Sequence, residues 1–346
     1  MKIINGDDCH DYLAPITKQK LAYTPNVNYE EWKGQVKEKL FDLLGMDKIA
    51  ENACPLKIEI EEDVMMDGYR QIRFIFDSEY SSTVPCYLLI PNTGKEKYPL
   101  AVLLQGHTTG FHLSIGKFRD NYDHFFTSGE YPDRNFFGLQ AVQNGYAALC
   151  IEQRALGERV TRRHGFFGDG ACAHIAATAL LMGRTVIGER VWDISRAIDV
   201  MDNFKMIDTD KILIAGHSGG GTASFYASCY DDRIKVSAVA GAFCSYQHSI
   251  INVSHCMCNY IPSVYEWFEM GDLTCLIAPK RFLVFNGVED PGFPNEGVDA
   301  AFNRAKEIFA RAGVPNNLRN VKMPCGHEWR ANMIWQAINE EFAKLK

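Results

Sequence analysis

The sequence predicts an α/β protein built on a mostly parallel, doubly wound sheet. Its first support is a set of continuous apolar runs, which are typical of strands buried on both faces of a parallel sheet. These runs occupy residues 98–107, 145–153, 211–218, 234–242 and 281–290. Helical stretches lie between or after them, at residues 136–145, 190–204, 221–230, 297–313 and 329–346. Because strand and helix alternate, we expect right-handed crossovers between parallel strands.

The N-terminal part of the chain has a different pattern. Residues 56–63, 69–78 and 84–91 alternate and are rich in β-formers, which predicts antiparallel strands at the N-terminal edge of the sheet. Before them, residues 28–45 predict an amphipathic helix, with Asn28 and Glu31 as a capping pair and Gly45 as its C-terminal stop.

These patterns predict a helical N-terminal extension over residues 1–55 and a single α/β domain over residues 56–346. Residues 1–27 give little periodic signal. Two long segments, 107–135 and 243–279, fit neither strand nor helix patterns, and we interpret them as loop insertions. Loops of that length in a compact domain commonly carry function.

Composition limits the partners and the compartment. The formal net charge is -7 and no run of Lys and Arg occurs, so we expect neither a nucleic acid nor a membrane surface as partner. No stretch approaches the roughly 18 to 20 apolar residues of a membrane span. The N-terminal segment has no apolar run behind its lysine, so we expect no secretory signal. Eleven cysteines, an odd number, are scattered through the chain, which predicts a reducing cytoplasm.

One short motif carries the candidate chemistry. Residues 216–220 read Gly-His-Ser-Gly-Gly, a G-x-S-x-G pentapeptide between a predicted strand and a predicted helix. In such a nucleophile elbow the serine occupies a strained turn above the sheet. Glycines flank it because neighbouring Cβ atoms would collide with the adjacent strand and helix. Ser218 is therefore the candidate nucleophile.

A serine hydroxyl needs a base, and the base needs an orienting acid. On a strand–elbow–helix fold the chain order is serine, acid, histidine. Three histidines follow Ser218, and His327 lies between a strand-like segment and the last helix. We predict His327 as the base, whereas His248 and His255 belong to the irregular segment and are predicted to be pocket wall or surface.

The acid is expected at the end of the strand 281–290, where Glu289 and Asp290 are both available. Asp290 lies just past the strand end, before a turn that Pro291 fixes, so we predict Asp290 as the orienting acid and Glu289 as a turn carboxylate that could still line the pocket.

Two backbone amides are predicted to form an oxyanion hole. One is the amide of Gly219, at the N-terminus of the helix after the serine. The second is expected in the loop "LLQGHTTGFH", from the amide of His107 or Thr108. Gly106 would let this loop approach closely, and the His107 imidazole is expected only to line the pocket.

Together, "IDTDKILIAGHSGGGTAS", "LLQGHTTG", "FNGVEDP" and "CGHE" resemble the α/β-hydrolase superfamily. The branch they are most similar to holds acetyl xylan esterases and cephalosporin-C deacetylase-like proteins, with dienelactone-hydrolase-like relatives. The resemblance covers roughly residues 56–346 and implies an α/β-hydrolase fold. It also implies Ser218, Asp290 and His327 as a catalytic triad that hydrolyses small carboxylic esters through an acyl-enzyme.

The resemblance also implies the partners. A small-molecule ester is the expected substrate, with acetylated carbohydrate as one candidate, and no cofactor is expected. The acyl and alcohol groups and the oligomeric state, including a homo-oligomer, stay open.

This chain departs from the family at one position. The esterases usually have glycine after the arginine that follows the fourth strand, whereas Ala155 follows Arg154 here. Arg154 is a candidate for the substrate pocket, as are His217 and Glu289. The more favoured interpretation of Arg154 is an arginine bound to carbonyls at the sheet end.

Rival interpretations remain. His255, Cys256 and Cys258 lie together in the sequence, but a structural zinc site needs four ligands and no second pair stands out, so we expect a soft pocket lining or core packing and no metal. A serine peptidase related to prolyl oligopeptidase has the same triad logic but usually carries a large N-terminal propeller, for which 55 residues leave no room. A non-catalytic binding protein on a hydrolase fold is the third alternative.

Overall fold

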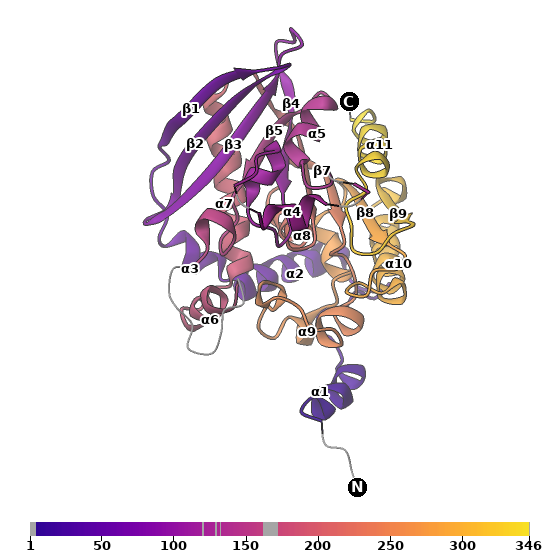
Figure 1. Cartoon of the computed structure of the whole chain (residues 1–346). Helices are drawn as coiled ribbons and strands as arrows, with labels where there is room; N and C mark the ends of the chain where they lie inside the picture. The colour runs from indigo at the N-terminus through magenta and orange to yellow at the C-terminus, as the bar shows by residue number, and fades with distance from the viewer. Residues whose placement is uncertain (1–4, 120, 129, 132, 162–171, 346) are drawn as a thin grey trace.

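The computed structural model describes residues 5–345 except 120, 129, 132 and 162–171. Nine strands form one mixed sheet in the order β1-β2-β3-β5-β4-β6-β7-β8-β9 (Figure 1). The strands are β1 (Ile58–Met66), β2 (Tyr69–Glu79), β3 (Ser82–Pro91), β4 (Tyr98–Leu104), β5 (Ala147–Ile151), β6 (Ile207–His217), β7 (Ile234–Ala240), β8 (Arg281–Gly287) and β9 (Leu318–Met323).

The direction of the strands changes along the sheet. Pairing is antiparallel from β1 through β2 and β3 to β5, and parallel from β5 through β4 to β9. The predicted antiparallel N-terminal edge and parallel remainder are therefore confirmed. β9 falls on the segment that only looked strand-like in the sequence.

The helices connect and cover the strands. The α-helices are α1 (Asp8–Leu13), α2 (Tyr29–Leu44), α3 (Met46–Ala50), α4 (Asp123–Thr127), α5 (Phe137–Gln143), α6 (Ala173–Leu181), α7 (Val186–Asp199), α8 (Gly219–Tyr230), α9 (Val264–Trp267), α10 (Asn295–Arg311) and α11 (Ala331–Phe342). Short helical turns are η1 (Ala14–Ile16), η2 (Phe111–Ile115), η3 (Gly157–Arg159), η4 (Val200–Asn203), η5 (Gln247–Ile251), η6 (Met257–Asn259), η7 (Asp272–Leu276) and η8 (Pro315–Asn317). None of the described helices is both long and apolar enough to cross a bilayer.

The sheet has a hydrophobic core on each face, and the alternation within its strands separates them. On β4, Leu100 and Val102 belong to one core, while Ala101 and Leu103 belong to the other. The first core is completed by α2, α7, α8 and α10, and the second by α5 and α11. Because α2 shares the first core, the helical segment before β1 packs on the same sheet that it precedes.

The strand order creates a crevice at one end of the sheet. β4 lies between β5 and β6: the chain leaves β4 for β5 on one side of it and then crosses from β5 to β6 on the other side. In open α/β sheets, ligands bind outside the carboxyl ends of the strands at such a switch point. Here the carboxyl ends of β4 and β6 lead directly into residues 105–107 and Ser218.

Three local predictions differ from the structure. Asn28 precedes α2, but its side chain makes no capping hydrogen bond, whereas Gly45 ends the helix with a φ of 76° as predicted. The helix expected from residue 190 begins at Val186, because the Thr185 hydroxyl accepts a hydrogen bond from the Gly188 amide at 3.0 Å and caps it there. The aperiodic N-terminal segment contains the short helix α1, which projects from the body (Figure 1).

Candidate active site

Ser218 occupies the sharp turn between β6 and α8. Its φ of 57° and ψ of -125° are unusual for a residue with a side chain, and α8 begins at the next residue, Gly219. Backbone strain of this kind persists only where the surroundings enforce it, and it clusters at functional sites. The Ser218 amide donates to the Ala240 carbonyl of β7 at 2.9 Å, which ties the turn to the neighbouring strand.

The glycines around the turn are required because the neighbouring backbone leaves no room for a Cβ atom. A Cβ on Gly216 would lie 2.3 Å from the Gly220 carbonyl oxygen of α8. A Cβ on Gly220 would lie 2.0 Å from the carbonyl oxygen of Leu104 in β4. Real Cβ atoms do not approach backbone this closely, so both positions need glycine. The predicted collision with strand and helix is thus the reason for the motif.

An imidazole and a carboxylate meet beside this turn. His327 Nδ1 lies 2.6 Å from Asp290 Oδ2, and the other carboxylate oxygen accepts the Gly292 amide at 2.9 Å. Burial would raise the pKa of Asp290, but the hydrogen bond and charge of His327 outweigh it and lower that pKa. Glu289 is exposed and makes no such contact in the described structure. Of the two candidate acids, it is Asp290 that holds the histidine.

Two rings fix the orientation of His327. Phe293 stacks on it with ring centroids 5.7 Å apart at 16°, and His217 lies 4.6 Å away on centroids at 38°. Part of His217 reaches solvent, but its Nε2 is shielded and has no hydrogen-bond partner among the described residues. Burial, followed by the nearby charge of His327, lowers the pKa of His217 to about 3, so His217 stays neutral. Because Asp290 takes Nδ1 of His327, Nε2 is the nitrogen left for proton exchange.

The loop after β4 approaches the serine from the other side. A Cβ on Gly106 would lie 3.0 Å from Ser218 Cβ, so glycine allows this contact. The Thr108 amide donates to the Gly106 carbonyl at 2.9 Å, whereas no described hydrogen bond uses the amides of His107 or Gly219. Of the two predicted second donors, His107 is therefore the one whose amide is available to an oxyanion.

A buried carboxylate supports that loop. Glu152 Oε1 accepts the side-chain amide of Gln105 at 2.8 Å, and its carboxylate also accepts the backbone amides of Phe111 and Glu158 at 3.3 and 3.1 Å. Burial raises the pKa of Glu152 to about 7, although the amide hydrogen bonds oppose the shift. Glu152 thus connects both ends of the 105–111 segment to the end of β5.

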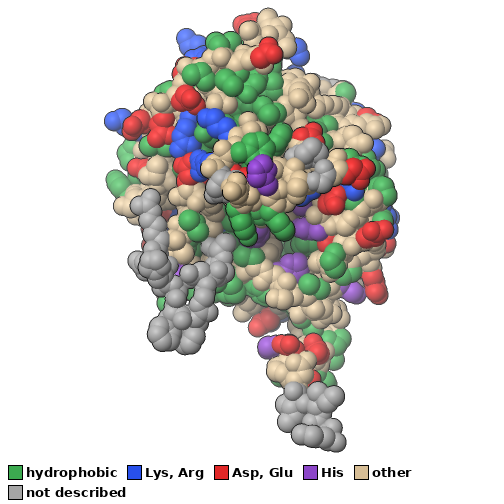
Figure 2. Space-filling model, viewed as in Figure 1, with side chains coloured by type: hydrophobic (Ala, Val, Ile, Leu, Met, Phe, Trp, Pro, Cys, Tyr) green, Lys and Arg blue, Asp and Glu red, His purple; other side chains and the backbone are tan. Residues whose placement is uncertain are grey.

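The candidate residues share one cleft of about 320 Å³. It is lined by His107, Ser218, Gly219, Thr222, Val253, Ser254, His255, Cys256, Asn259, Asp290, Pro291, Gly292, Phe293 and His327. On the face shown in Figure 2, histidine side chains gather around a hollow near the middle of the molecule. Ser218 Oγ makes no hydrogen bond to His327 in the described structure, which is common for catalytic pairs without substrate.

The three predicted pocket residues do not line the cleft among the described residues. Arg154 is buried instead in an ion-pair network: its guanidinium contacts Glu79, lies 3.2 Å from Glu189, and lies 2.9 Å from Asp193. The favoured expectation of carbonyl partners is also wrong, because the partners are carboxylates. Ala155 adopts a φ of 68°, the conformation for which the family's glycine is suited. Glu289 faces solvent, and His217 packs beneath His327.

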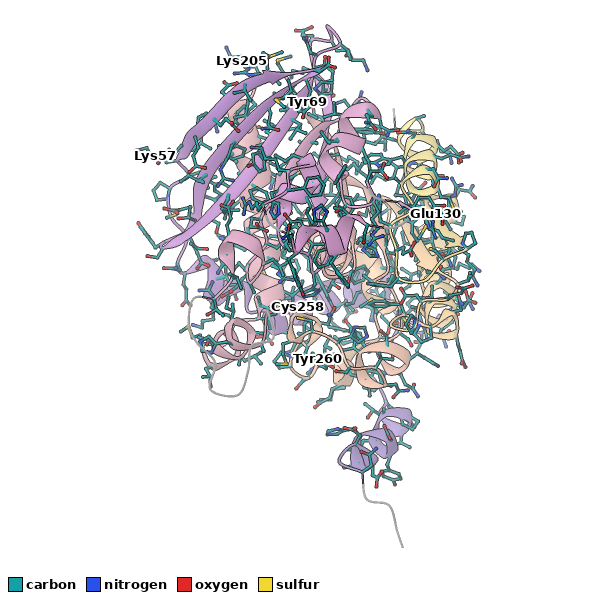
Figure 3. The ribbon with its side chains drawn as sticks, viewed as in Figure 1. Lys57, Tyr69, Glu130, Lys205, Cys258 and Tyr260 are labelled. Atoms are coloured by element: carbon teal, nitrogen blue, oxygen red, sulfur yellow. The ribbon has the colours of Figure 1, made fainter. Side chains whose placement is uncertain are left out.

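One wall of the cleft comes from the predicted insertion 243–279; sequence analysis had His255 as pocket wall or surface but did not single out Val253, Ser254 or Asn259. The segment 243–279 contributes Val253 to Cys256 and Asn259, and His255 packs against Phe293 with ring centroids 5.1 Å apart. Cys258 and Tyr260, labelled in Figure 3, belong to the same segment. The length of the segment was the available signal, but its irregular backbone gave no register. In the other insertion, positions 120, 129 and 132 lie outside the described residues.

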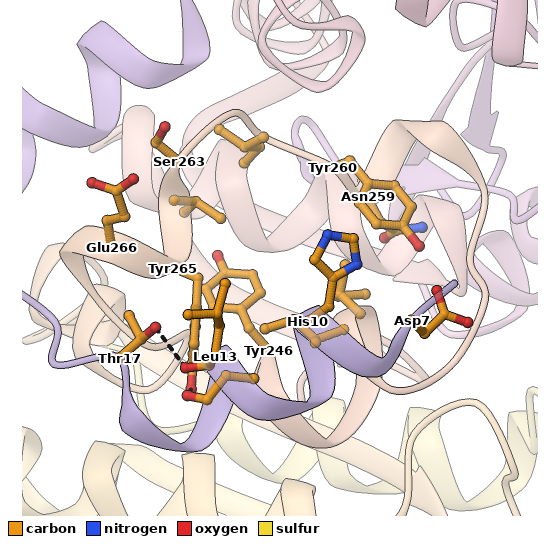
Figure 4. Close-up of a pocket in the computed structure, with 15 residues that line it drawn as sticks. Asp7, His10, Leu13, Thr17, Tyr246, Asn259, Tyr260, Ser263, Tyr265 and Glu266 are labelled. Carbon is orange, nitrogen blue, oxygen red and sulfur yellow. Dashed lines mark hydrogen bonds between the residues drawn. The ribbon is translucent and has the colours of Figure 1, made fainter. Parts of the chain in front are cut away.

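A second cleft, of about 450 Å³, lies between the N-terminal segment and residues 246–266 (Figure 4). Asp7, His10 and Leu13 line one side, and Tyr246 and Tyr260 line the other. Asn259 borders both clefts. The larger cleft is lined by Ser263, which has a φ of 58°, but His327 and Asp290 line the smaller cleft together with Ser218. The smaller cleft is therefore the candidate active site.

Comparisons with known proteins agree with this architecture. YtaP of Bacillus subtilis (strain 168), which is named as a hydrolase, is 26% identical over 314 residues, covering 88% of this chain and 97% of YtaP. A Bacteroides fragilis structure named as an acetyl xylan esterase has a TM-score of 0.74 at 14% identity, covering 98% of this chain and 95% of that one. A glucuronoyl esterase from Solibacter usitatus has a TM-score of 0.67 at 12% identity, covering 94% and 96%.

At such identities the solved structures establish the α/β-hydrolase fold. The sequence itself goes further, because the Abhydrolase family model matches residues 9–324. With the elbow, the sheet order and this match in agreement, the chain belongs to the Abhydrolase family.

Proposed function

We propose that this protein is a serine esterase that hydrolyses small carboxylic esters through an acyl-enzyme, with Ser218 as nucleophile, His327 as base and Asp290 as orienting acid. The observation that carries the proposal is the 2.6 Å contact between His327 and Asp290 in the cleft that also holds the strained Ser218. Nucleophile, base and orienter in one accessible site are the set that acyl transfer needs.

The proposed reaction has two halves. His327 Nε2 takes the proton of Ser218 Oγ as the oxygen attacks the ester carbonyl, and the amides of Gly219 and His107 stabilise the oxyanion. When the tetrahedral intermediate collapses, the ester C–O bond breaks and His327 returns the proton to the departing alcohol. Water then attacks the acyl-serine by the same steps and releases the carboxylic acid.

The cleft supports an uncharged substrate. Its described lining contains no lysine or arginine, and its one carboxylate, Asp290, is bound to His327. Ser254, Thr222 and Asn259 offer polar groups to an alcohol part, and a volume of about 320 Å³ suits a small ester. Acetylated carbohydrate is our candidate, and the esterase names of the structural neighbours lend it support.

The proposal extends to the setting of the enzyme. None of the eleven cysteines forms a disulfide, which supports a reducing compartment such as the cytoplasm. Residues 56–346 form the proposed catalytic domain, with residues 1–55 as an extension that packs on it.

The first test is labelling with a fluorophosphonate probe together with turnover of p-nitrophenyl acetate and p-nitrophenyl butyrate. We expect wild type to be labelled and to prefer acetate, and Ser218→Ala to lose both labelling and all but a trace of turnover while keeping its circular dichroism. Ser254→Ala, which removes another hydroxyl from the same cleft, should still be labelled.

The same samples separate the alternatives. Release of acetate from acetylated xylose would support the carbohydrate ester, whereas cleavage of peptide anilides without ester turnover would support the peptidase. Failure of a folded wild-type protein to react with the probe would overturn the proposal in favour of a binding protein.

A further inference from the structure

One imidazole and three thiols meet beside the cleft. His107 Nε2 or Nδ1 and the sulfurs of Cys172, Cys256 and Cys258 all lie within 4.8 Å of one another. Three segments supply them: the loop after β4, the start of α6, and η6 with the residue before it. Cys258, labelled in Figure 3, lies toward the middle of the molecule in that view. Cys172 and Cys258 are fully buried, and His107 and Cys256 are half-buried.

The distances agree with those around a tetrahedral zinc ion. His107 Nε2 lies 3.5 Å from Cys172 Sγ and 3.6 Å from Cys258 Sγ. Zn–S bonds of about 2.3 Å and Zn–N bonds of about 2.0 Å at a tetrahedral angle separate sulfur from nitrogen by about 3.5 Å. A ring nitrogen has either one hydrogen or one lone pair, so a simple hydrogen bond accounts for only one of the two sulfurs. A single ion between them accounts for both.

A buried arginine next to the thiols provides a second, independent observation. Arg190 is 1% exposed, and its Nη2 lies 3.2 Å from Cys172 Sγ. Its Nε and Nη2 donate to the Arg154 carbonyl, while Nη1 has no partner among the described residues. No described carboxylate pairs with this guanidinium, in contrast to Arg154 and Arg184 nearby.

The charge of Arg190 therefore needs a counter-ion. A buried, unpaired guanidinium is strongly unfavourable. Three thiolates and one neutral imidazole around Zn²⁺ have a net charge of -1, which would balance Arg190 at contact distance. Neutral thiols would leave that charge uncompensated.

We propose that His107, Cys172, Cys256 and Cys258 bind one zinc ion in a closed, structural Cys₃His site. Four protein ligands fill the tetrahedron, so no position remains for water or substrate and the ion takes no direct part in hydrolysis. On binding, the three cysteines release their protons and zinc forms four bonds, without any change of oxidation state.

The site would fix the loop that carries the second oxyanion donor. The His107 side chain binds zinc while its backbone amide faces the chemistry, so the ion would hold that amide through one residue. The sequence expectation of no metal is revised by this proposal. Only Cys256 and Cys258 are close in the sequence, and the other two ligands come from distant segments.

The test is the metal content of the purified full-length protein, measured by inductively coupled plasma mass spectrometry after expression with zinc. We expect about one zinc ion per chain in wild type. Cys256→Ser should lose most of it, because a serine hydroxyl is a poor zinc ligand. Cys54→Ser removes an equally half-buried thiol outside the cluster and should keep the full complement.

Two further measurements keep the proposal open to refutation if a variant folds poorly. Removing zinc from the wild-type protein with a chelator should lower its Tm, and adding Zn²⁺ back should restore the Tm. Replacement by Co²⁺ should give the visible bands of a tetrahedral, thiolate-bound ion.

Zinc far below one per chain in folded wild type, or a disulfide among the three cysteines by mass spectrometry, would overturn the site. So would full zinc retention by Cys256→Ser. Metal content is measured without substrate, so the two proposals are tested separately. A protein that binds zinc but hydrolyses no ester would contradict only the proposed function. An active esterase without zinc would contradict only the proposed zinc site.

Discussion

Two buried aspartates, Asp193 and Asp290, stand in opposite situations. Asp193 in α7 accepts hydrogen bonds from Arg154 at 2.9 Å and Arg159 at 2.7 Å. Asp290 after β8 holds the imidazole of His327, which is 35% exposed to the cleft. Both are nearly inaccessible themselves, at 1% and 5%.

The difference lies in the partner. Burial would raise the pKa of Asp193, but its arginines outweigh burial and hold that pKa far below its usual range. Arginine does not release its proton in proteins, so that centre has one charge state and can only support the fold. Histidine changes its charge near neutral pH, so the Asp290 centre can move a proton. A buried carboxylate therefore becomes a candidate for chemistry when its partner can titrate and faces an open cleft.

The largest effect is expected on activity, from a change to Asp290. Asp290→Asn should lower kcat for p-nitrophenyl acetate by about 10⁴-fold, because His327 would lose the acid that sets its tautomer. The unfolding free energy should change much less than kcat. Steady-state kinetics and urea denaturation of the same preparation check both.

Glu289→Gln is the matched control, one residue earlier in the same turn, and it should leave kcat within a few-fold of wild type. If Glu289→Gln were the damaging change and Asp290→Asn the mild one, the assignment of the acid would be reversed.

The next largest effect is expected on stability, from a change to Asp193. Asp193→Asn should lower the unfolding free energy by about 3–5 kcal/mol, because it leaves Arg154 and Arg159 buried with too little negative charge. Asp199→Asn, which weakens the partly exposed pairs of Asp199 with Arg196 and Arg233, both at 2.6 Å, should cost about 1 kcal/mol. Chemical denaturation at pH 7 measures both, and equal losses would show that burial of the network contributes nothing.

A third prediction concerns Glu152, whose carboxylate has amide partners only. Its pKa of about 7 in the folded protein exceeds the usual value of 4.5, so the folded state binds more protons between these pH values. The unfolding free energy of wild type should therefore fall on the order of 3 kcal/mol relative to Glu152→Gln as pH rises from 4.5 through 7.

Denaturation curves of both proteins across that range would check the sign. Glu158 and Arg119, which act on the Glu152 carboxylate through their charges, are present in both and cancel in the difference. A difference that stays constant with pH would mean that Glu152 is ionised throughout.

The smallest effect is expected at His217. His217→Phe keeps a ring beneath His327 and removes a shielded nitrogen without a described partner, so stability should change by less than about 1 kcal/mol. Turnover should fall only a few-fold. Because His217 stays neutral down to about pH 3, the acid limb of kcat/KM should involve one proton in wild type and variant alike. If the acid limb of kcat/KM involved two protons in wild type and one in His217→Phe, His217 would titrate together with His327.

Local pattern predicted the fold well, for a physical reason. Strands such as β4 and β6 are buried on both faces, so their apolar runs stand out in the sequence without any knowledge of neighbours. The elbow was visible because the glycines that it requires, Gly216 and Gly220, lie within five residues of the sequence, although the atom closest to Gly220 belongs to Leu104 of β4.

Contacts between distant segments were not predictable in this way. Nothing near Arg154 in the sequence distinguishes carboxylate partners on β2 and α7 from carbonyl partners, and Asn28 lies at a cap position without making the cap bond. The wall around His255 depends on how an irregular segment folds back on the sheet. The grouping of His107 and Cys172 with two later cysteines likewise appears only when the crossovers are complete.

The order of the residues in the chain also has a consequence during synthesis. His327 follows Ser218 by 109 residues, and α8 and β7 lie between them. At elongation rates of about 5–20 residues per second, the ribosome makes the serine roughly 5 to 20 s before its proposed base. A growing chain thus carries the proposed nucleophile before its proposed base, and we expect esterase activity only after most of the sheet has been made.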